Sequence, residues 1–188
     1  MNIRKATTDD IRQILQIYAY ARTQMKRSGN PGQWKDSYPA LEIIEQDIQN
    51  GTSYVIEDTA QAEAEPEIAA VFVLIHGDDP TYRRIENGSW LNHEPYAAVH
   101  RIASSGKRKG ILRCCLSFCE ARAANIRIDT HADNHIMQHL LESSGYCKCG
   151  RIYVADGSPR IAYQKKTDVP LYESSACGNN KAASTPSS

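Results

Sequence analysis

The chain carries, from residue 102 to residue 112, the stretch Ile102-Ala103-Ser104-Ser105-Gly106-Lys107-Arg108-Lys109-Gly110-Ile111-Leu112. Its apolar start is typical of a strand, its polar middle of a turn, and its apolar end of the first turn of a helix. A helix N-terminus offers unpaired N–H groups and a partial positive charge, and Gly110 lets the backbone approach an anion closely. The stretch therefore predicts a phosphate-binding turn. A solvated basic turn that binds nothing is the alternative.

The segments on either side of this turn alternate between helix and strand patterns. We expect strands at the apolar start around Ile3 and over residues 54–56, 68–75, 96–103, 126–129, 146–154 and 160–165. We expect helices after Thr7–Asp10, from near Pro39, over residues 110–124 and over residues 134–144. Three strands follow one another between helices, which excludes a doubly wound sheet and favours an α/β fold with a mixed sheet.

Length and composition limit the class of protein. A chain of 188 residues is the size of one domain. Lys plus Arg and Asp plus Glu both number 22, and this zero net charge argues against binding to nucleic acid, which needs a basic excess. No apolar run approaches the roughly 20 residues of a membrane span, and the polar N-terminus does not resemble a signal peptide. We therefore expect no membrane partner, a cytoplasmic location, and six cysteines that remain thiols.

Three segments are predicted to lack regular structure. Residues 60–66 form a polar loop rich in Ala and Glu, and residues 76–95 carry the Gly, Asp, Pro and Asn of a long loop or lid. Residues 166–188 are polar and rich in Ser, Ala and Asn, so they are expected to be a disordered tail. The domain is accordingly expected to cover residues 1–165.

The turn resembles the pyrophosphate loop of the GNAT superfamily of acetyl-CoA-dependent N-acetyltransferases, which reads Arg/Gln-x-x-Gly-x-Gly/Ala. The residues from Lys107 to Leu112 match this pattern with two departures. Lys107 keeps the charge of Arg, whereas Leu112 puts a bulky side chain where Gly or Ala stands beside the cofactor. The chain from Ile3 to Ile11 is also similar to a family opening, and the likeness covers residues 1–165.

A second motif supports the resemblance. Asn134, Met137, Leu141 and Gly145-Tyr146 match the family spacing Asn-x-x-Ala-x-x-x-Tyr-x-x-x-Gly-Phe. Many members carry at the position of Leu141 a tyrosine that protonates the leaving thiolate, and leucine cannot do this. Together with Leu112, this departure leaves a non-catalytic acyl-CoA-binding or regulatory module as an alternative.

The resemblance implies a mostly antiparallel mixed sheet flanked by helices, with strands that splay at the cofactor site. It implies transfer of the acetyl group of acetyl-CoA to a primary amine, most simply of a small molecule, in a ternary complex. Acetylation of a protein or peptide is a further alternative, and dimers are common for this fold, so a homodimer is one expected state. The expected cofactor-binding residues are Ile102, Ala103, Ser104, Lys107, Arg108, Lys109, Gly110, Ile111, Leu112 and Asn134.

Transfer to an amine requires a group that removes a proton. His100 lies two residues before Ile102 on the predicted cofactor strand, and an unperturbed imidazole titrates near pH 6.5, which suits this role. Strand alternation places His100 and Ile102 on one face and Arg101 on the other, unless a bulge interrupts the strand. A packed, hydrogen-bonded histidine is the alternative, with Asp129 among the weaker candidates for the base.

Aromatic residues gather in two segments that flank the acceptor side of GNAT-like folds. The residues expected to bind the amine are Gln33, Trp34, Tyr38, Tyr82 and Trp90. An aromatic wall suits an amine with an apolar body through cation–π contact. Ordinary packing of large side chains is the alternative for each of them.

A metal site is not expected. His131, His135 and His139 are spaced by four, but the helix is predicted to begin near Asn134, which leaves His131 outside it. No Cys-x-x-Cys pair occurs, so the cysteines are interpreted as small apolar residues of the core.

Overall fold

A seven-stranded sheet passes through the described part of the molecule, in the order β1-β2-β3-β4-β5-β7-β6. The computed structural model describes residues 1–35, 37–59 and 67–169. The strands are β1 (Asn2–Lys5), β2 (Ser53–Asp58), β3 (Glu67–His76), β4 (Ala97–Ser104), β5 (Asn125–Thr130), β6 (Cys147–Tyr153) and β7 (Pro159–Lys166). The helices are α1 (Ile11–Arg27), α2 (Leu41–Gln49), α3 (Ile111–Glu120) and α4 (His135–Ser143), with short 3₁₀ turns at Thr8–Asp10 and Pro80–Tyr82. This element order confirms the α/β prediction.

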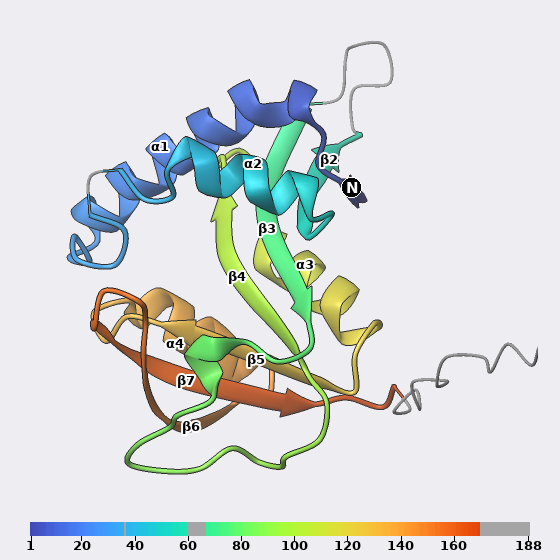
Figure 1. Ribbon diagram of the computed structural model, residues 1–188. Coiled ribbons are helices and arrows are strands. Elements are labelled where there is room, and N and C mark those ends of the chain that lie inside the picture. The colour runs from blue at the N-terminus through green and yellow to red at the C-terminus, as the bar shows by residue number, and fades with distance from the viewer. Residues whose placement is uncertain (36, 60–66, 170–188) are drawn as a thin grey trace, which may run out of the picture.

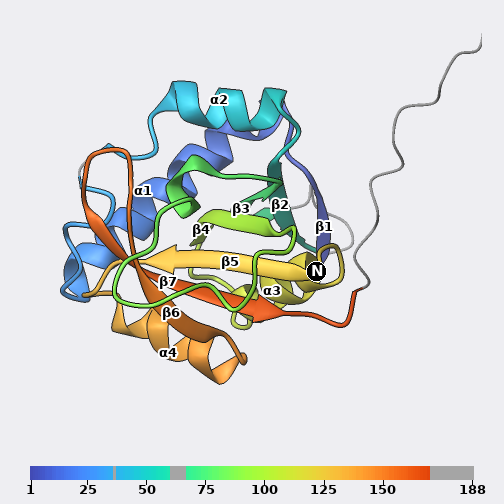
Figure 2. The same cartoon turned by 60° about the horizontal axis from the view of Figure 1, so that its bottom comes forward.

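Helices cover both faces of the sheet. Helices α1 and α2 lie on one side, and α3 and α4 lie on the other (Figure 2). Along β3, Val71 packs into the cluster under α1 and α2, whereas the neighbouring Phe72 packs into the cluster under α3 and α4. The strand is almost continuously apolar because both of its faces are buried.

The sheet parts in its middle. Strands β4 and β5 run parallel and pair only from Ala97–Ile126 to Val99–Ile128, after which they diverge (Figure 1). The other neighbouring strands are antiparallel, as expected for the fold. The splayed strands of the prediction are therefore present, and they separate beyond Val99 and Ile128.

A bulge bends β4 at the point where it leaves β5. The register against β3 shifts, because Val71 pairs with Ala103 but Val73 pairs with His100, so β4 holds one extra residue. Arg101 has a φ of 52°, in the left-handed region that a non-glycine residue seldom adopts. The hydroxyl of Tyr18 donates to the carbonyl of Arg101 at 3.2 Å, so α1 pins the bulge.

The ends of the domain differ in detail from the expectation. Helix α3 ends at Glu120, four residues before the predicted end at Ala124. Strand β7 continues through Lys166, and the N–H of Thr167 donates to the carbonyl of Ala124 at 2.8 Å. The predicted loop 60–66 and the predicted tail beyond Val169 lie outside the described residues. None of the described helices has both the length and the apolar composition needed to cross a membrane.

Candidate active site

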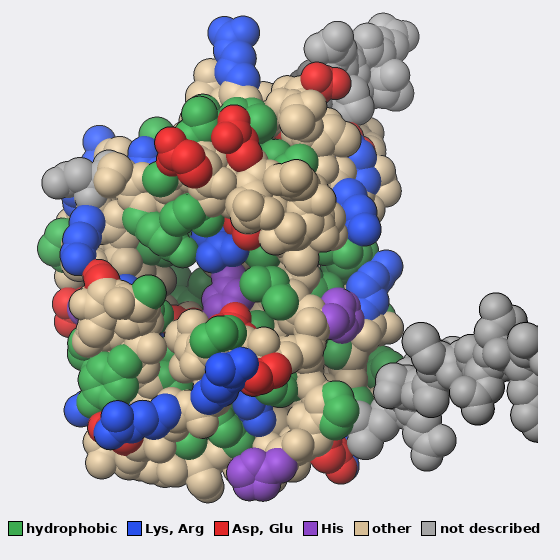
Figure 3. All heavy atoms as spheres, viewed as in Figure 1, with side chains coloured by type: hydrophobic (Ala, Val, Ile, Leu, Met, Phe, Trp, Pro, Cys, Tyr) green, Lys and Arg blue, Asp and Glu red, His purple; other side chains and the backbone are tan. Residues whose placement is uncertain are grey.

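Two hollows meet where β4 and β5 part. The larger, about 850 Å³, lies between the end of β4 and helices α3 and α4, and we call it the cleft. The smaller, about 490 Å³, lies among the segment 25–38, β4, β5 and the β6–β7 turn, and we call it the pocket. Ile102, Asn134 and Met137 line both. On the face shown in Figure 3, histidine and charged side chains gather around a hollow.

Bare backbone forms one end of the cleft. Gly110 caps α3 with a φ of 78°, and a Cβ placed on it would have no atom within 4 Å. The first N–H groups of α3 have no partner within the helix, so an anion here would meet both these donors and the positive end of the helix dipole. Of the residues expected to bind the cofactor, seven line the cleft: Ile102, Ala103, Ser104, Gly110, Ile111, Leu112 and Asn134.

The three basic residues of the turn are exposed and do not line the cleft. The Lys107 ammonium pairs with Glu67, and the Arg108 guanidinium binds both carboxylate oxygens of Asp58, with an Nη2–Oδ1 distance of 2.8 Å. Exposed pairs of this kind contribute little to stability and exchange readily with other anions. From these positions the side chains could reach an anion in the cleft only through their long-range field.

Asn134 connects the cleft to the pocket. Its Oδ1 accepts from the N–H of Met137 at 3.1 Å, which caps α4, and its Nδ2 donates to Oε1 of Gln33 at 2.9 Å. Gln33 lies in the segment between α1 and α2 and lines the pocket. One side chain thus links α4, at the cleft, to the segment between α1 and α2, at the pocket.

His100 faces the pocket between two carboxylates. Its Nε2 lies 2.8 Å from Oδ2 of Asp79, and its Nδ1 lies 3.9 Å from Oδ1 of Asp129. Burial raises the pKa of Asp79, but hydrogen bonds from His100 and from Thr81 outweigh this effect and bring it to about 2. Asp79 therefore stays ionised and holds Nε2 of the imidazole. The other ring nitrogen, Nδ1, is left facing Asp129.

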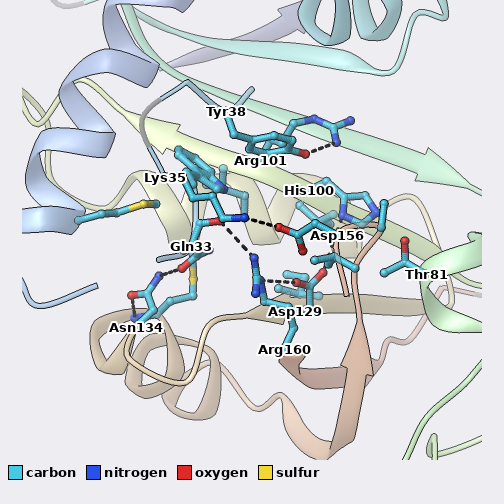
Figure 4. A pocket seen from close by; sticks show the side chains of 18 of the residues that line it. Gln33, Lys35, Tyr38, Thr81, His100, Arg101, Asp129, Asn134, Asp156 and Arg160 are labelled. Carbon is cyan, nitrogen blue, oxygen red and sulfur yellow. Dashed lines mark hydrogen bonds and ion pairs between the residues drawn. The ribbon is translucent and has the colours of Figure 1, made fainter. Parts of the chain in front are cut away.

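The bulge changes which side chains share a face. His100, Arg101 and Ile102 all line the pocket, whereas unbroken alternation would place Arg101 on the opposite face. The guanidinium of Arg101 forms a two-pronged pair with Asp47, at 2.9 Å from Nε and 2.7 Å from Nη2, and its Nη1 donates to the hydroxyl of Tyr38 at 3.2 Å (Figure 4). The extra residue in β4 thus adds a charged side chain to the pocket.

The aromatic residues divide into two groups. Trp34 and Tyr38 line the pocket together with Gln33, but Tyr82 and Trp90 do not. Tyr82 is 1% exposed, stacks on the ring of His100 at a centroid distance of 5.5 Å, and donates to Asp129 at 2.8 Å. Burial, reinforced by Asp129, raises the pKa of Tyr82 well above its ordinary value, so the phenol keeps its proton. Tyr82 therefore helps to hold the His100 ring in place through stacking.

Trp90 has a packing role in the structure. It is 8% exposed, and together with Tyr96 it encloses the guanidinium of Arg127, at 4.1 Å and 3.8 Å from the two ring centroids. This cation–π cluster anchors the long loop 77–96 to β5. The aromatic wall expected from the sequence is thus reduced to the Trp34 and Tyr38 side of the pocket.

Comparison with solved structures identifies the fold. A GNAT-family acetyltransferase from Streptococcus agalactiae 2603 is 32% identical, with a TM-score of 0.76 over 89% of this chain and 96% of that one. The chain belongs to the GNAT family. An acetyltransferase of the same family from Listeria monocytogenes 4b F2365 is 22% identical, with a TM-score of 0.63 over 88% of this chain and 94% of that one.

A third similar structure was solved with a ligand. It is the NatB acetyltransferase complex bound to CoA and MES, whose matching chain is 12% identical, with a TM-score of 0.58 over 89% of this chain and 99% of that one. No protein-family model and no curated protein matches the sequence. As a GNAT acyltransferase, the protein uses acetyl-CoA as its co-substrate.

Several charged residues of this GNAT pocket were not identified from the sequence. Lys35 and Asp156 pair at 2.8 Å across the pocket (Figure 4), and Arg160 at the start of β7 points into it. Asp79 follows a Gly-Asp pair and precedes a proline, so it has the signature of a turn, and its Oδ1 does cap the Pro80–Tyr82 turn. Its second oxygen binds His100, a contact that only the folded chain creates.

Two further sequence motifs lie outside both hollows. Leu141 is fully buried in the cluster under α3 and α4 and lines neither the cleft nor the pocket. His135 and His139 are exposed on α4, and in the part of the chain that the structure describes no three His, Cys, Asp or Glu residues are grouped to hold a metal ion. The five described cysteines are free thiols.

Proposed function

We propose that this GNAT enzyme transfers the acetyl group of acetyl-CoA directly to the primary amine of a small molecule, within a ternary complex. The observation that carries the proposal is the meeting of the cleft and the pocket at Ile102 and Asn134, with His100 on the pocket side. A donor in one hollow and an acceptor in the other would reach a shared opening without a covalent relay. Acetyl transfer between neighbouring ligands needs no more than this positioning and a proton acceptor.

The cleft residues fit the parts of acetyl-CoA. The start of α3, bare at Gly110, would hold the pyrophosphate, and Lys107, Arg108 and Lys109 would attract it from a distance. The backbone of Ile102–Ser104, left without a β5 partner, would bind the pantetheine arm, and Asn134 would lie beside it. Acetyl-CoA supplies an activated acetyl carbon and a thiolate that leaves.

His100 is proposed as the general base. The amine nitrogen forms a bond to the acetyl carbon, the carbon–sulfur bond breaks, and the proton of the amine passes to Nδ1 of His100. Asp79 holds the opposite nitrogen at 2.8 Å, so it fixes the ring orientation and stabilises the imidazolium that forms. Asp129, at 3.9 Å from Nδ1 of His100, is the second candidate for the general base.

A dedicated acid for the thiolate is not required by this chemistry. A comparable thiol has an unperturbed pKa of about 8.5, so its thiolate departs at neutral pH with modest help. Since Leu141 is core, the proposed reaction places no acid at that position. The base therefore matters more than the acid for the rate.

The dimensions of the pocket favour a small acceptor. Its volume is about 490 Å³, within the range of sites for small molecules, and Lys35 and Asp156 bridge it. A peptide acceptor needs an open groove. A cytoplasmic location and a homodimer stay predictions from the sequence, and sedimentation of the purified protein would measure the oligomeric state.

A screen of amines for release of the CoA thiol tests the proposal. Each amine is mixed with acetyl-CoA and the purified protein, and the acetylated product is confirmed by mass spectrometry. We expect release with at least one small amine, and loss of that release in His100→Gln with CoA binding retained. Release only with protein N-termini or lysine-containing peptides would replace the small-molecule acceptor by a peptide.

A further inference from the structure

Two arginines enter the pocket, and their charges are compensated differently. Arg101 faces Asp47 through two hydrogen bonds of 2.9 Å and 2.7 Å, so a full carboxylate neutralises it. Arg160 is 7% exposed, and its Nη1 and Nη2 donate to the neutral carbonyls of Pro159 and Gln33, at 3.0 Å and 3.1 Å. A buried charge whose hydrogen-bond partners among the described residues are neutral is costly, so Arg160 has capacity for an anion.

The carboxylate beside Arg160 is already shared. Oδ2 of Asp129 lies 4.0 Å from Nε of Arg160, beyond hydrogen-bond distance. Oδ1 of the same residue accepts from Tyr82 at 2.8 Å and faces Nδ1 of His100 at 3.9 Å. The Asp129 carboxylate therefore interacts with three neighbouring side chains. Both oxygens of Asp47, in contrast, accept from Arg101.

We propose that Arg160 binds a carboxylate of the acceptor, so that the substrates are small aminocarboxylates. This inference rests on the proposed function and names its substrate class. A guanidinium presents paired N–H donors that match a carboxylate in one plane, which gives strong and directional binding. Apart from its two carbonyl partners, Arg160 retains donors for such a contact among the described residues.

The spacing of the charges indicates that the amine and the carboxylate of the substrate lie close together. Asp129 sits between His100 and Arg160 and is about equally far from each, at 3.9 Å and 4.0 Å. An amine at His100 and a carboxylate at Arg160 would thus flank a single carboxyl group (Figure 4). Asp129 attracts the ammonium form of the amine, and Arg160 the carboxylate. A free α-amino acid has this compact arrangement, with its side chain left to contact Trp34 and Tyr38.

The same arrangement disfavours a peptide. At a protein N-terminus the α-carboxyl group is an amide, which has no charge to offer a guanidinium. Arg160 would then have no carboxylate within hydrogen-bond distance among the described residues. The proposal therefore predicts that free amino acids bind better than their amides.

Calorimetry with matched ligand pairs tests this inference apart from catalysis. The wild-type protein, saturated with CoA, is titrated with each common amino acid and with the amine that lacks its carboxyl group, such as phenylalanine against phenethylamine. We expect at least one amino acid to bind roughly tenfold to a hundredfold more tightly than its amine, the range of a charged hydrogen bond. Equal or weaker binding of every amino acid overturns the proposal.

Arg160→Gln supplies the matched variant, and Arg151→Gln, an exposed arginine on neighbouring β6, supplies the control. The ratio of the Kd of the amine to the Kd of the matching amino acid should fall to near one in Arg160→Gln. It should be intermediate in Arg160→Lys and unchanged in Arg151→Gln. A preference that survives Arg160→Gln overturns the assignment. Should that variant fail to fold, the wild-type protein supplies the test. Where phenylalanine is the preferred ligand, the binding of 3-phenylpropionate is compared with that of 3-phenylpropanol. Weaker or equal binding of the carboxylate overturns the proposed carboxylate site.

The outcome separates the two proposals. Tight binding of an amino acid without thiol release would refute the proposed transfer and keep the carboxylate site. Thiol release with amines that carry no carboxylate, at the same efficiency as with amino acids, would keep the transfer and refute the carboxylate site.

Discussion

The cleft and the pocket are adjacent, but they are built from different materials. In the cleft, the proposed phosphate and pantetheine sites are backbone features: a helix start, a left-handed glycine and a strand edge without a β5 partner. In the pocket, the proposed chemistry depends on charged side chains from separate segments, and three ion pairs hold them in place: Asp79–His100, Asp47–Arg101 and Lys35–Asp156. Backbone sites follow from the local sequence, whereas the contacts of paired side chains depend on the whole fold. The two hollows should therefore respond differently to substitution.

The largest effect is expected at the pocket. His100→Gln removes the proposed base while it keeps the size of the side chain, so kcat/KM should fall by about 10²–10⁴. The acidic limb of the pH–rate profile should disappear with it, because the group that must be deprotonated is gone. Steady-state kinetics across pH 5–9 with an accepted amine measures both. A loss below threefold with the limb retained would exclude His100 from the mechanism.

A second substitution tests the support of that histidine through stability. The pKa of Asp79 is lowered to about 2 in the folded protein, below its value of about 3.9 in an unfolded chain. The ionised carboxylate therefore stabilises the fold above about pH 4, and this contribution is lost as the pH falls through 2.

Asp79→Asn should consequently lower the free energy of unfolding by up to about 2 kcal/mol near pH 6, and the deficit should shrink toward pH 2. Urea denaturation of both proteins at several pH values measures it. Glu45→Gln, at an exposed position on α2, is the control and should show no such trend. A deficit that does not depend on pH would mean that the His100–Asp79 pair does not form in solution.

In the cleft, the expected effect comes from the backbone. Gly110→Val forces a β-branched residue into the left-handed region and puts atoms into open space where the phosphates are proposed to lie. The Kd for CoA should rise by roughly tenfold or more. Gly29→Val shares the positive φ and the open surroundings but lies at the end of α1, so it should cost stability without changing CoA binding. Equal CoA affinity in both variants would remove the phosphate site from α3.

The smallest effect is expected from the basic side chains of the turn. Lys109→Glu reverses an exposed charge, so the Kd for CoA should rise by about threefold at low salt and by less at 0.5 M, because salt screens exposed charges over about 10 Å or less. Binding measured at two ionic strengths provides the comparison. A large loss that does not depend on salt would show that Lys109 contacts the ligand directly.

The difference between local backbone features and long-range side-chain pairs explains which parts of the site could be predicted from the sequence. The element order, the mixed sheet and the turn at Gly110 follow from local periodicity and from glycine, and the structure has them in place. Seven of the ten cofactor residues line the cleft because consecutive residues at a strand end and a helix start stay together. Their roles in binding remain predictions.

Less of the pocket than of the cleft could be predicted from the sequence. Tyr82 and Trp90 were expected in its wall, but one supports His100 and the other encloses Arg127, because large aromatic side chains near a sheet are readily recruited into its core. Asp79 and Arg160 were not identified, because each acquires its contacts from a partner far along the chain. Arg101 was expected on the face opposite His100, yet it lines the pocket. The orientation of Arg101 depends on a bulge, which periodicity does not reveal.

The early parting of β4 and β5 predicts that the lifetime of the protein in a cell depends on the supply of CoA. Beyond Val99 and Ile128 the facing edges of the two central strands pair with no other strand of the described residues, and such edges invite unwanted pairing with other chains. A ligand that fills the gap covers these edges and shifts the folding equilibrium, by about 2.7 kcal/mol at a hundred times its Kd. Cells depleted of CoA should then degrade or aggregate this protein sooner, so that its abundance follows the supply of its own co-substrate.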